Sequence, residues 1–297
     1  MILGLSLYAA VFLFIGLSAY KAVEYGRMPL HGRMELYPVP AEKGRQQYGG
    51  SYMEEPEWWR KPRQVSKSSE LIEMLKEMLF IKKLFDNQRS FWWISYALHI
   101  GIYFLMAWTI LLVAGTLTDL AGASVSDRAS IWTAFLYYFT VLAGWTGFVL
   151  ATAGAVLLVI RRAFDPILKK YTTPQEYLNL LLLLAALVSG ITVWSPDPTF
   201  GYARQATMDV LTLSIAPNLA LLIHLIILEV TFIYIPLSKM SHYVGKYFSF
   251  HKVLWENEPN IAGSPMENQV KTALLNTANN TWAAPHIQPA EAPKSES

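Results

Sequence analysis

Long apolar runs separated by polar stretches dominate the sequence. Each run can cross the roughly 30 Å hydrocarbon layer of a bilayer as a helix, whereas irregular backbone there would leave costly unpaired polar groups. The pattern therefore predicts an all-α fold, an integral membrane bundle of five transmembrane helices. The predicted spans cover residues 2–23, 91–116, 130–160, 177–194 and 216–237.

The distribution of basic residues predicts the orientation of this bundle. Of the 24 Lys and Arg residues, only Arg128 and Arg204 lie outside segments 21–91, 161–175 and 239–297. Because loops rich in Lys and Arg stay in the cytoplasm, we expect the N-terminus outside (N-out) and the C-terminus in the cytoplasm (C-in). The expected location is the cytoplasmic (inner) membrane, with several passes through the lipid bilayer.

The predicted spans divide the chain into four parts. The first run lacks a preceding basic region and is followed by Lys21, which favours a retained signal-anchor helix over residues 1–23 rather than a cleaved signal peptide. Residues 24–90 form a long cytoplasmic segment, residues 91–243 a four-helix membrane domain, and residues 244–297 a cytoplasmic tail. The tail has no periodicity, so disorder is expected in isolation, with ordering over a partner as the alternative.

The cytoplasmic segment 24–90 is expected to dock a partner. Pro and Gly break any helical period in its first part, so we expect an extended, looping chain there. Its aromatic side chains either rest at the lipid interface or form a docking surface for a soluble subunit, and the enrichment of aromatics in interface cores favours docking. These aromatics are Tyr37, Tyr48, Tyr52, Trp58 and Trp59.

Residues 69–85 are predicted to form one amphipathic helix. Apolar residues recur there at helical spacing, with Lys76, Lys82 and Lys83 beside them. Ser69 is expected to cap the start of the helix. Such a helix lies on the cytoplasmic membrane face, so its expected role is anchoring rather than chemistry.

The composition excludes several kinds of redox site. The chain has no Cys, which excludes an iron–sulfur cluster bound by its own thiolates, a covalent haem attachment and any disulfide. Any redox centre is therefore held noncovalently or belongs to a partner. The net charge of +2 gives no reason to expect nucleic acid as a partner.

Two histidines in and after the last predicted span, His224 and His242, are the clearest candidates for chemistry. They are 18 residues apart, about five turns or roughly 27 Å along one helix, so both imidazoles are expected on one face. One nitrogen ligand would then lie near each membrane surface. That is what a protein needs to hold two haems across a membrane, since imidazole is a natural axial ligand of haem iron.

His99 and Glu229 extend this candidate site. His99 lies near the cytoplasmic start of the second predicted span, so we expect it to meet His242 in the same leaflet. A histidine in a span can instead bond a neighbouring helix, but three at these depths favour ligation. Glu229, the only acid well inside a predicted span, is a candidate proton relay, or equally a protonated carboxyl bonded between helices.

Short motifs along the chain carry a family resemblance. They are residues 98–102, 161–166, 172–173, 224–225 and 236–242, which read LHIGI, RRAFDP, TT, HL and PLSKMSH. These motifs resemble the NarI family, the cytochrome b subunits of respiratory nitrate reductase. The likeness runs over roughly residues 91–243 and includes the histidine spacing, so it implies a NarI-like haem-binding domain.

Motifs in the cytoplasmic segment narrow this resemblance. Residues 35–40, 42–45, 48–52 and 58–59 read ELYPVP, EKGR, YGGSY and WW. They are similar to the DsrM/HmeC-type membrane cytochromes b, which belong to menaquinol oxidoreductase complexes linked to dissimilatory sulfite reduction. With these motifs the resemblance covers nearly everything before the tail.

The resemblance implies the quinol-oxidising, electron-transfer subunit of a multi-subunit oxidoreductase. Menaquinol would be oxidised in the membrane, and electrons would reach a cytoplasmic iron–sulfur subunit resembling the catalytic subunit of heterodisulfide reductase. It also implies further membrane and extracytoplasmic redox subunits. His99 and His242 would ligate a haem b near the cytoplasmic face, and His224 a second haem b near the outer face, beside the quinol site.

One position departs from the family pattern. The nitrate reductase subunit has a second histidine ten residues after the first, where this chain has Thr109. The sixth ligand of the outer haem is therefore open: Met106 supplies it through sulfur, the iron stays five-coordinate and high-spin, or this haem is absent. We expect a second haem bound through His224, and hence mixed-spin haem.

Two other functions compete with this interpretation. One is a proton or ion transporter that uses intramembrane His and Glu, although the broken helices and repeats typical of transporters are not evident. The other is a passive membrane anchor for a soluble oxidoreductase, which leaves the histidine spacing as coincidence. A reducible b-type absorbance spectrum of the purified chain would separate electron transfer from both.

Overall fold

The computed structural model describes residues 1–27, 55–61, 66–126, 130–249 and 261–276, and in these ranges the chain forms helices joined by turns, without strands. The all-α prediction is confirmed for this part of the chain. Five of its helices are long and apolar enough to cross a membrane, which is typical of a multi-pass membrane protein. They are α1 (Ile2–Arg27), α4 (Arg89–Leu120), α5 (Ile131–Phe164), α7 (Pro174–Trp194) and α9 (Leu219–Leu237).

Shorter helices lie between and after the spans. Each covers only one to four turns, too little to cross a bilayer. They are η3 (Trp58–Arg60), α2 (Lys67–Phe80), α3 (Lys82–Asn87), α6 (Pro166–Tyr171), α8 (Gly201–Leu211), η4 (Lys239–Ser241), α10 (His242–Ser249) and α11 (Pro265–Asn276).

The chain separates into two compact units, which are described one at a time. The first unit, residues 1–22 and 74–244, contains most of α1, the second half of α2 and everything from α3 to η4. The second unit, residues 23–73 and 245–297, contains η3 and α11. All candidate site residues of the sequence analysis belong to the first unit.

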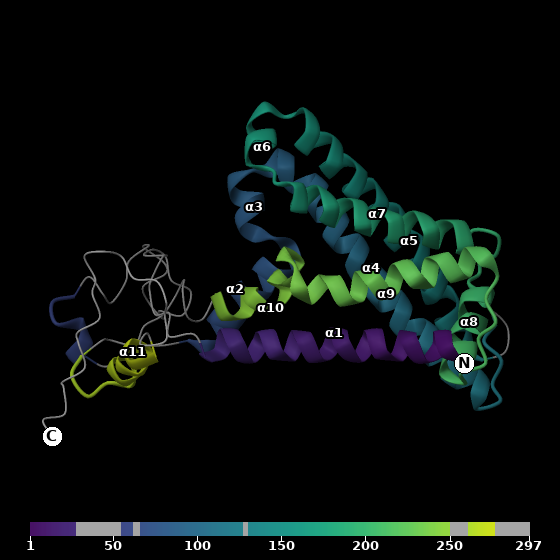
Figure 1. Ribbon diagram of the computed structural model, residues 1–297, viewed down its shortest axis with the longest axis horizontal. Coiled ribbons are helices and arrows are strands. Elements are labelled where there is room, and N and C mark those ends of the chain that lie inside the picture. The colour runs from purple at the N-terminus through teal and green to yellow at the C-terminus, as the bar shows by residue number, and fades with distance from the viewer. Residues whose placement is uncertain (28–54, 62–65, 127–129, 250–260, 277–297) are drawn as a thin grey trace, which may run out of the picture. The chain divides into compact units, whose positions relative to one another are not determined.

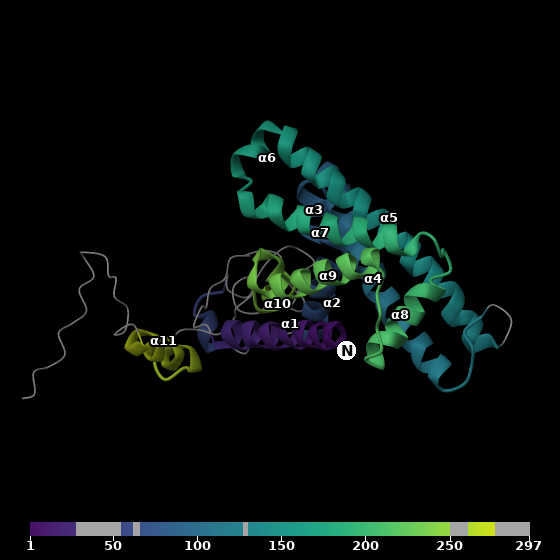
Figure 2. The same cartoon turned by 45° about the vertical axis from the view of Figure 1, so that its right-hand side comes forward.

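The spans of the first unit alternate in direction, which gives it two ends. Helix α6 connects α5 to α7 at one end, and α8 connects α7 to α9 at the other (Figure 1). Helix α1 runs alongside α9 in both Figures 1 and 2. We refer below to the α6 end, where α4 begins and α9 ends, and to the α8 end, where α4 ends and α9 begins.

Glycines let α4 and α5 touch through their backbones. A Cβ on Gly154 of α5 would meet the Leu98 backbone, with Leu98 Cα only 2.8 Å away. A Cβ on Gly101 of α4 would meet Ala151 in the same way, 2.7 Å from its Cα. Small residues allow this close approach between membrane helices. The contact fixes the segment of α4 that carries His99.

Helix α2 ends on side chains of α4. The last carbonyls of a helix have no partner within the helix and need an outside donor. Trp92 Nε1 donates to Phe80 O over 2.7 Å, and Tyr103 Oη donates to Met78 O over 2.6 Å. These bonds hold the C-terminal turn of α2 against the first turns of α4, beside His99.

The structure corrects the prediction of one helix over residues 69–85. The backbone breaks at Ile81, which adopts the left-handed conformation with φ 51°, and α3 begins at Lys82. The buried carboxylate of Glu77 accepts a bond from the Lys83 amide over 2.8 Å, which satisfies a donor freed by the break. The expected cap is also displaced, since Ser66 Oγ accepts from the Ser69 amide over 3.4 Å.

Within the described residues 261–276 of the tail a helix forms, α11, where the composition predicted disorder. Ser264 Oγ accepts a bond from the Glu267 amide over 3.1 Å, and Pro265 occupies the first helical position. A salt bridge of 2.7 Å joins Glu267 to Lys271 one turn later. The helix therefore has a cap and an i,i+4 ion pair, which periodicity alone does not reveal.

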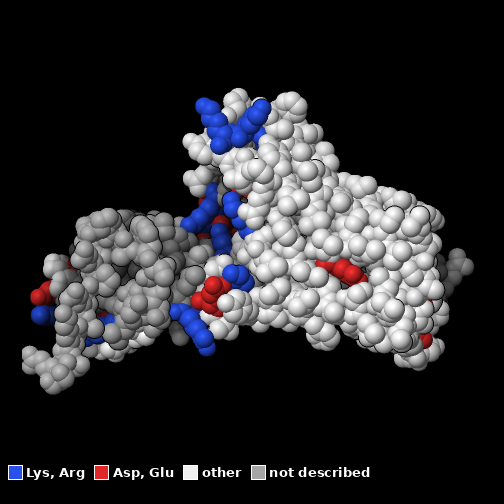
Figure 3. Space-filling model, in the orientation of Figure 1, with Lys and Arg blue, Asp and Glu red and all other residues white. Residues whose placement is uncertain are grey.

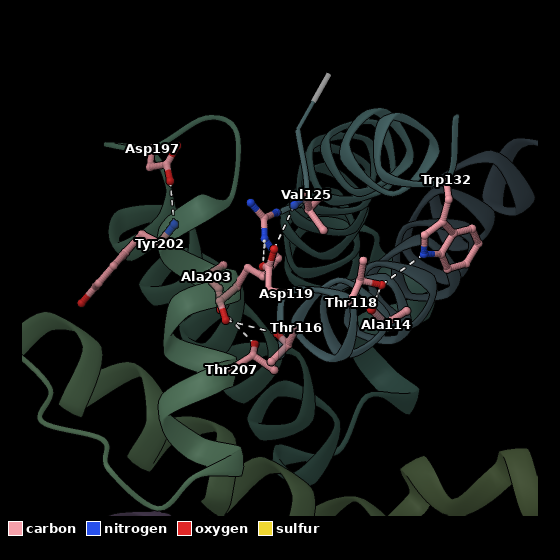
Figure 4. A network of polar contacts seen from close by, with 11 residues as sticks. Ala114, Thr116, Thr118, Asp119, Val125, Trp132, Asp197, Tyr202, Ala203 and Thr207 are labelled. Atoms are coloured by element: carbon pink, nitrogen blue, oxygen red, sulfur yellow. Dashed lines mark hydrogen bonds and ion pairs between the residues drawn. The ribbon is translucent and has the colours of Figure 1, made fainter. Parts of the chain in front are cut away.

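A polar network ties α4 to α8 at the α8 end (Figure 4). Asp119 of α4 forms a 3.1 Å salt bridge with Arg204 of α8 and accepts a bond from the Val125 amide over 2.8 Å. Thr116 donates to the Arg204 carbonyl over 3.2 Å. Only 13% of the Arg204 side chain is exposed, so this is a largely buried ion pair that closes the bundle.

Charged side chains are sparse on the face of the spans shown in Figure 3, and Lys and Arg atoms gather around α6. Helix α6 carries Lys169 and Lys170, and α5 carries Arg161 and Arg162 in its last turn. The sequence predicted this basic cluster, because these Lys and Arg residues lie in the short segment between two predicted spans.

Candidate functional site

His99 and His242 come together at the α6 end of the first unit. Their ring centroids lie 6.1 Å apart, with an angle of 67° between the ring planes. His99 projects from α4, and His242 is the first residue of α10. The expected meeting of these two histidines is confirmed.

A backbone carbonyl orients each of the two imidazoles. His99 Nδ1 lies 2.7 Å from Ser95 O, and His242 Nδ1 lies 3.2 Å from Lys239 O. A carbonyl can only accept, so Nδ1 carries the hydrogen in both rings. The Nε2 atom of each ring then has a free lone pair, which is the arrangement found in metal-ligating histidines.

The structure corrects the route by which His242 reaches this position. We predicted His224 and His242 on one continuous helix, but α9 ends at Leu237. Pro236 lacks a backbone donor, and Ser238 is extended, with its hydroxyl accepting from the Met240 amide over 3.1 Å. His242 therefore starts a new helix, and the histidine spacing does not measure one straight helix.

Two neutral imidazoles from different helices, each with a free lone pair on Nε2, are a donor set that suits haem iron. His99 is half-buried and His242 is exposed. No cluster of three or more His, Cys, Asp or Glu that could hold a metal occurs among the described residues. The two imidazoles alone match the ligand set of a six-coordinate haem.

Aromatic side chains surround the α4 side of this pair. Tyr96, one turn before His99, stacks on Trp92 with ring centroids 4.5 Å apart and an angle of 11°. Phe80 of α2 lies on Tyr96 at 6.3 Å. The Trp92 and Tyr96 rings lie on the two turns of α4 before His99, and Phe80 connects that part of α4 to the end of α2.

The first span supports the His242 side. Ser18 of α1 shares a 2.5 Å hydrogen bond with the hydroxyl of Tyr243, the neighbour of His242. Phe14 stacks on the Tyr243 ring at 6.0 Å. The sequence analysis missed these residues, and the only signal was a serine within an apolar run.

Ion pairs hold η4, whose carbonyl orients His242. Lys239 Nζ lies 3.8 Å from the Glu176 carboxylate at the start of α7, and Glu176 lies 4.0 Å from Arg162. In the same turn, Asp165 caps α6, and hydrogen bonds from the Leu168 and Ile167 amides lower the pKa of its carboxyl. The RRAFDP and TT motifs thus build the turn that fixes η4.

His224 lies at the α8 end in a different surrounding. Only 4% of it is exposed. Its Nδ1 lies 2.9 Å from Ser189 Oγ, and Ser189 itself donates to Ala186 O over 3.1 Å. The indole of Trp194 stands edge-on to the imidazole at 5.7 Å. These contacts match the competing interpretation of a histidine bonded to a neighbouring helix.

The described residues do not bring a second ligand to His224. Met106 is 59% exposed on α4, and Thr109 donates to Leu105 O of its own helix over 3.0 Å. Trp108 packs on Trp194 at 6.2 Å, and the indole nitrogens of both are buried without a hydrogen-bond partner. His224 is therefore the one candidate ligand at this position among the described residues, and the second haem stays a prediction.

Glu229 lies between α9 and α1. It is half-buried, and Ser6 Oγ lies 2.7 Å from its Oε1 atom. Glu229 is about one and a half turns nearer the α6 end than His224, and no contact joins their side chains, so the structure does not place the two in one cluster. Tyr37, Tyr48 and Tyr52, expected in a docking surface, lie outside the described residues.

Comparisons of this chain with known protein families, with curated proteins and with solved structures give no match. The resemblance to quinol-oxidising cytochromes b therefore stays a prediction, and the geometry of the His99–His242 pair carries the functional argument.

Proposed function

We propose that this chain is the membrane cytochrome b subunit of a respiratory complex, in which His99 and His242 hold a haem b. One observation carries the proposal: two imidazoles from different helices meet with ring centroids 6.1 Å apart, and both have Nδ1 bonded to a backbone carbonyl. A bound haem b supplies reversible one-electron transfer. The chain's own residues bind it and fix the two rings.

The proposed orientation places the α6 end in the cytoplasm. Arg161, Arg162, Lys169 and Lys170 support this because loops rich in Lys and Arg stay on the cytoplasmic side. The first residue of α1 then lies outside, the C-terminus is cytoplasmic, and the membrane is the cytoplasmic membrane. The His99–His242 pair would face a cytoplasmic electron acceptor.

The proposed reaction is menaquinol oxidation near the outer surface. Menaquinol releases two electrons and two protons when it is oxidised to menaquinone. Glu229 would relay a proton through its carboxyl, releasing one proton before it takes up the next, since it is the half-buried carboxyl within α9. His224 would be the one protein ligand of a second haem b.

The proposed partners are redox subunits. Electrons would leave to a cytoplasmic iron–sulfur subunit resembling the catalytic subunit of heterodisulfide reductase, in a complex linked to sulfite reduction, with further membrane and extracytoplasmic redox subunits. Residues 24–90 would dock the iron–sulfur subunit. Trp58 and Trp59 support this role, since their rings lie edge to face at 6.0 Å and 43% of Trp59 is exposed.

The absorbance spectrum of the purified full-length chain tests the proposal. We expect a reduced-minus-oxidised b-type spectrum, reduction by a soluble menaquinol analogue, and loss of the low-spin haem in His99→Ala and in His242→Ala. Thr109→Ala is the matched control, because its hydroxyl only bonds its own helix, and it should keep the full spectrum. A colourless, folded protein would overturn the proposal in favour of a transporter or a passive anchor.

A further inference from the structure

The hydroxyl of Ser6 lies between two oxygen atoms. Its Oγ is 2.7 Å from Glu229 Oε1 and 2.9 Å from Leu3 O. A serine hydroxyl has one hydrogen to donate and two lone pairs to accept with. When Glu229 is ionised, both neighbouring oxygens are acceptors, so Ser6 can satisfy only one of them.

A proton on Glu229 resolves this conflict. The carboxyl O–H then donates to Ser6 Oγ, and the Ser6 hydroxyl donates to Leu3 O, so both short contacts become hydrogen bonds. Loss of that proton turns the Ser6 hydroxyl from Leu3 O towards Glu229. Both contacts of Ser6 Oγ can therefore be hydrogen bonds only while Glu229 carries a proton.

The surroundings of Glu229 also favour the neutral form. Among the described residues, Glu229 forms no salt bridge. The nearest titratable groups along the two helices bond elsewhere: Tyr8 donates to Leu211 O over 3.4 Å, His224 Nδ1 lies 2.9 Å from Ser189, and Tyr234 donates to Asn179 Oδ1 over 2.8 Å. An unpaired carboxylate within an apolar span is costly.

We propose that Glu229 and Ser6 form a proton-binding site between α9 and α1, in which the Ser6 hydroxyl reorients as the proton binds and leaves. Leu3 lies in the first turn of α1, at the α8 end. A Ser6 hydroxyl that turns from Glu229 to Leu3 O therefore points its hydrogen towards the α8 end. The inference deepens the proposed function by giving its proton acceptor a partner on the first span. The site itself needs neither haem nor quinol.

Infrared spectroscopy of the purified full-length chain, in a detergent without ester groups, tests this site at neutral pH. We expect a carbonyl-stretch band of a protonated carboxyl that shifts down in D₂O and is lost in Glu229→Gln. In Ser6→Ala the band should move to higher frequency because a hydrogen bond is removed. Ser6→Thr, which keeps the hydroxyl, should leave the band at its original frequency.

Ser18→Ala is the matched control. Ser18 lies on the same helix and also bonds a carbonyl one turn before it, Phe14 O at 2.6 Å, but its second partner is Tyr243. This variant should leave the band unchanged. A band that survives in Glu229→Gln, or stays in place in Ser6→Ala, would overturn the proton site. Failure of the proposed function would instead appear as missing haem absorbance, which this measurement does not use.

Discussion

The imidazoles of His99 and His242 meet at the same end of the bundle with their ring centroids 6.1 Å apart, although α5, α7 and α9 separate them along the chain. Each ring is oriented by the backbone just before it: Ser95 lies one turn earlier in α4, and Lys239 lies in η4. The pair thus depends on where α4 begins and on how the chain turns after α9.

The turn after α9 should control how firmly His242 is held. Ser238→Ala removes the hydroxyl that accepts from the Met240 amide, which weakens a helix cap by about 1 kcal/mol. We expect the bound haem to dissociate about fivefold faster and its low-spin paramagnetic resonance signal to broaden. Ser249→Ala, which removes a bond within α10 only, is the control. Equal haem loss in both variants would contradict this role of Ser238.

The number of haems bound per chain should show whether His224 ligates a haem separate from that of His99 and His242. In His224→Ala we expect one of two haems to be lost, together with the high-spin part of a mixed-spin signal, while the low-spin signal of the His99–His242 site persists. The pyridine haemochrome assay and spin-state spectroscopy measure both quantities. A single low-spin haem in the unmodified chain would show that His224 only bonds Ser189, as its 4% exposure suggests.

The backbone contact between α4 and α5 should make Gly154 sensitive to substitution. Gly154→Ala places a methyl group against the Leu98 backbone, and overpacking of this kind costs about 1–3 kcal/mol. Gly16→Ala in α1 meets no atom within 4 Å and should be neutral or slightly stabilising. Thermal unfolding in detergent compares the two, and equal midpoints would disprove the close contact.

Tyr103 should stabilise α2. Tyr103→Phe leaves Met78 O without its donor at the end of α2, which costs about 1–2 kcal/mol. Hydrogen exchange over α2 should therefore speed up, with little change in α7. Tyr138→Phe on the exposed side of α5 is the control, because 58% of Tyr138 is exposed. Unchanged protection of α2 in Tyr103→Phe would contradict the prediction.

The Asp119–Arg204 ion pair should couple α4 to α8. A double-mutant cycle with Asp119→Ala and Arg204→Ala is expected to give a coupling energy of about 1–2 kcal/mol. The pair is largely buried, so high salt should reduce this coupling only slightly. Additive effects of the two substitutions would mean that the contact adds nothing to stability.

The sequence predicted the elements that the membrane imposes. An apolar run that must satisfy its own backbone has to be helical, so the five spans could be placed to within a few residues. The meeting of His99 and His242 followed from alternating span directions alone. Both inferences depend on the bilayer rather than on details of packing.

The remaining details depend on contacts that periodicity does not contain. The break at Ile81 is matched by the carboxylate of Glu77, and the end of α9 is set by Pro236 and the Ser238 cap. The pattern of apolar and polar residues around each of these two breaks fits an unbroken helix. The partners Ser6 and Ser189 were also missed, since a lone serine in an apolar run gives no hint of what it faces.

The joint at Ser238 changes how the membrane itself acts on the site. A span that is too long or too short for the local lipid layer tilts, and tilting sweeps the residues at its ends sideways. His242 lies beyond the joint, and its neighbour Tyr243 is bonded to Ser18 of α1. A change in bilayer thickness would therefore tilt α9 while the His242 imidazole keeps its position.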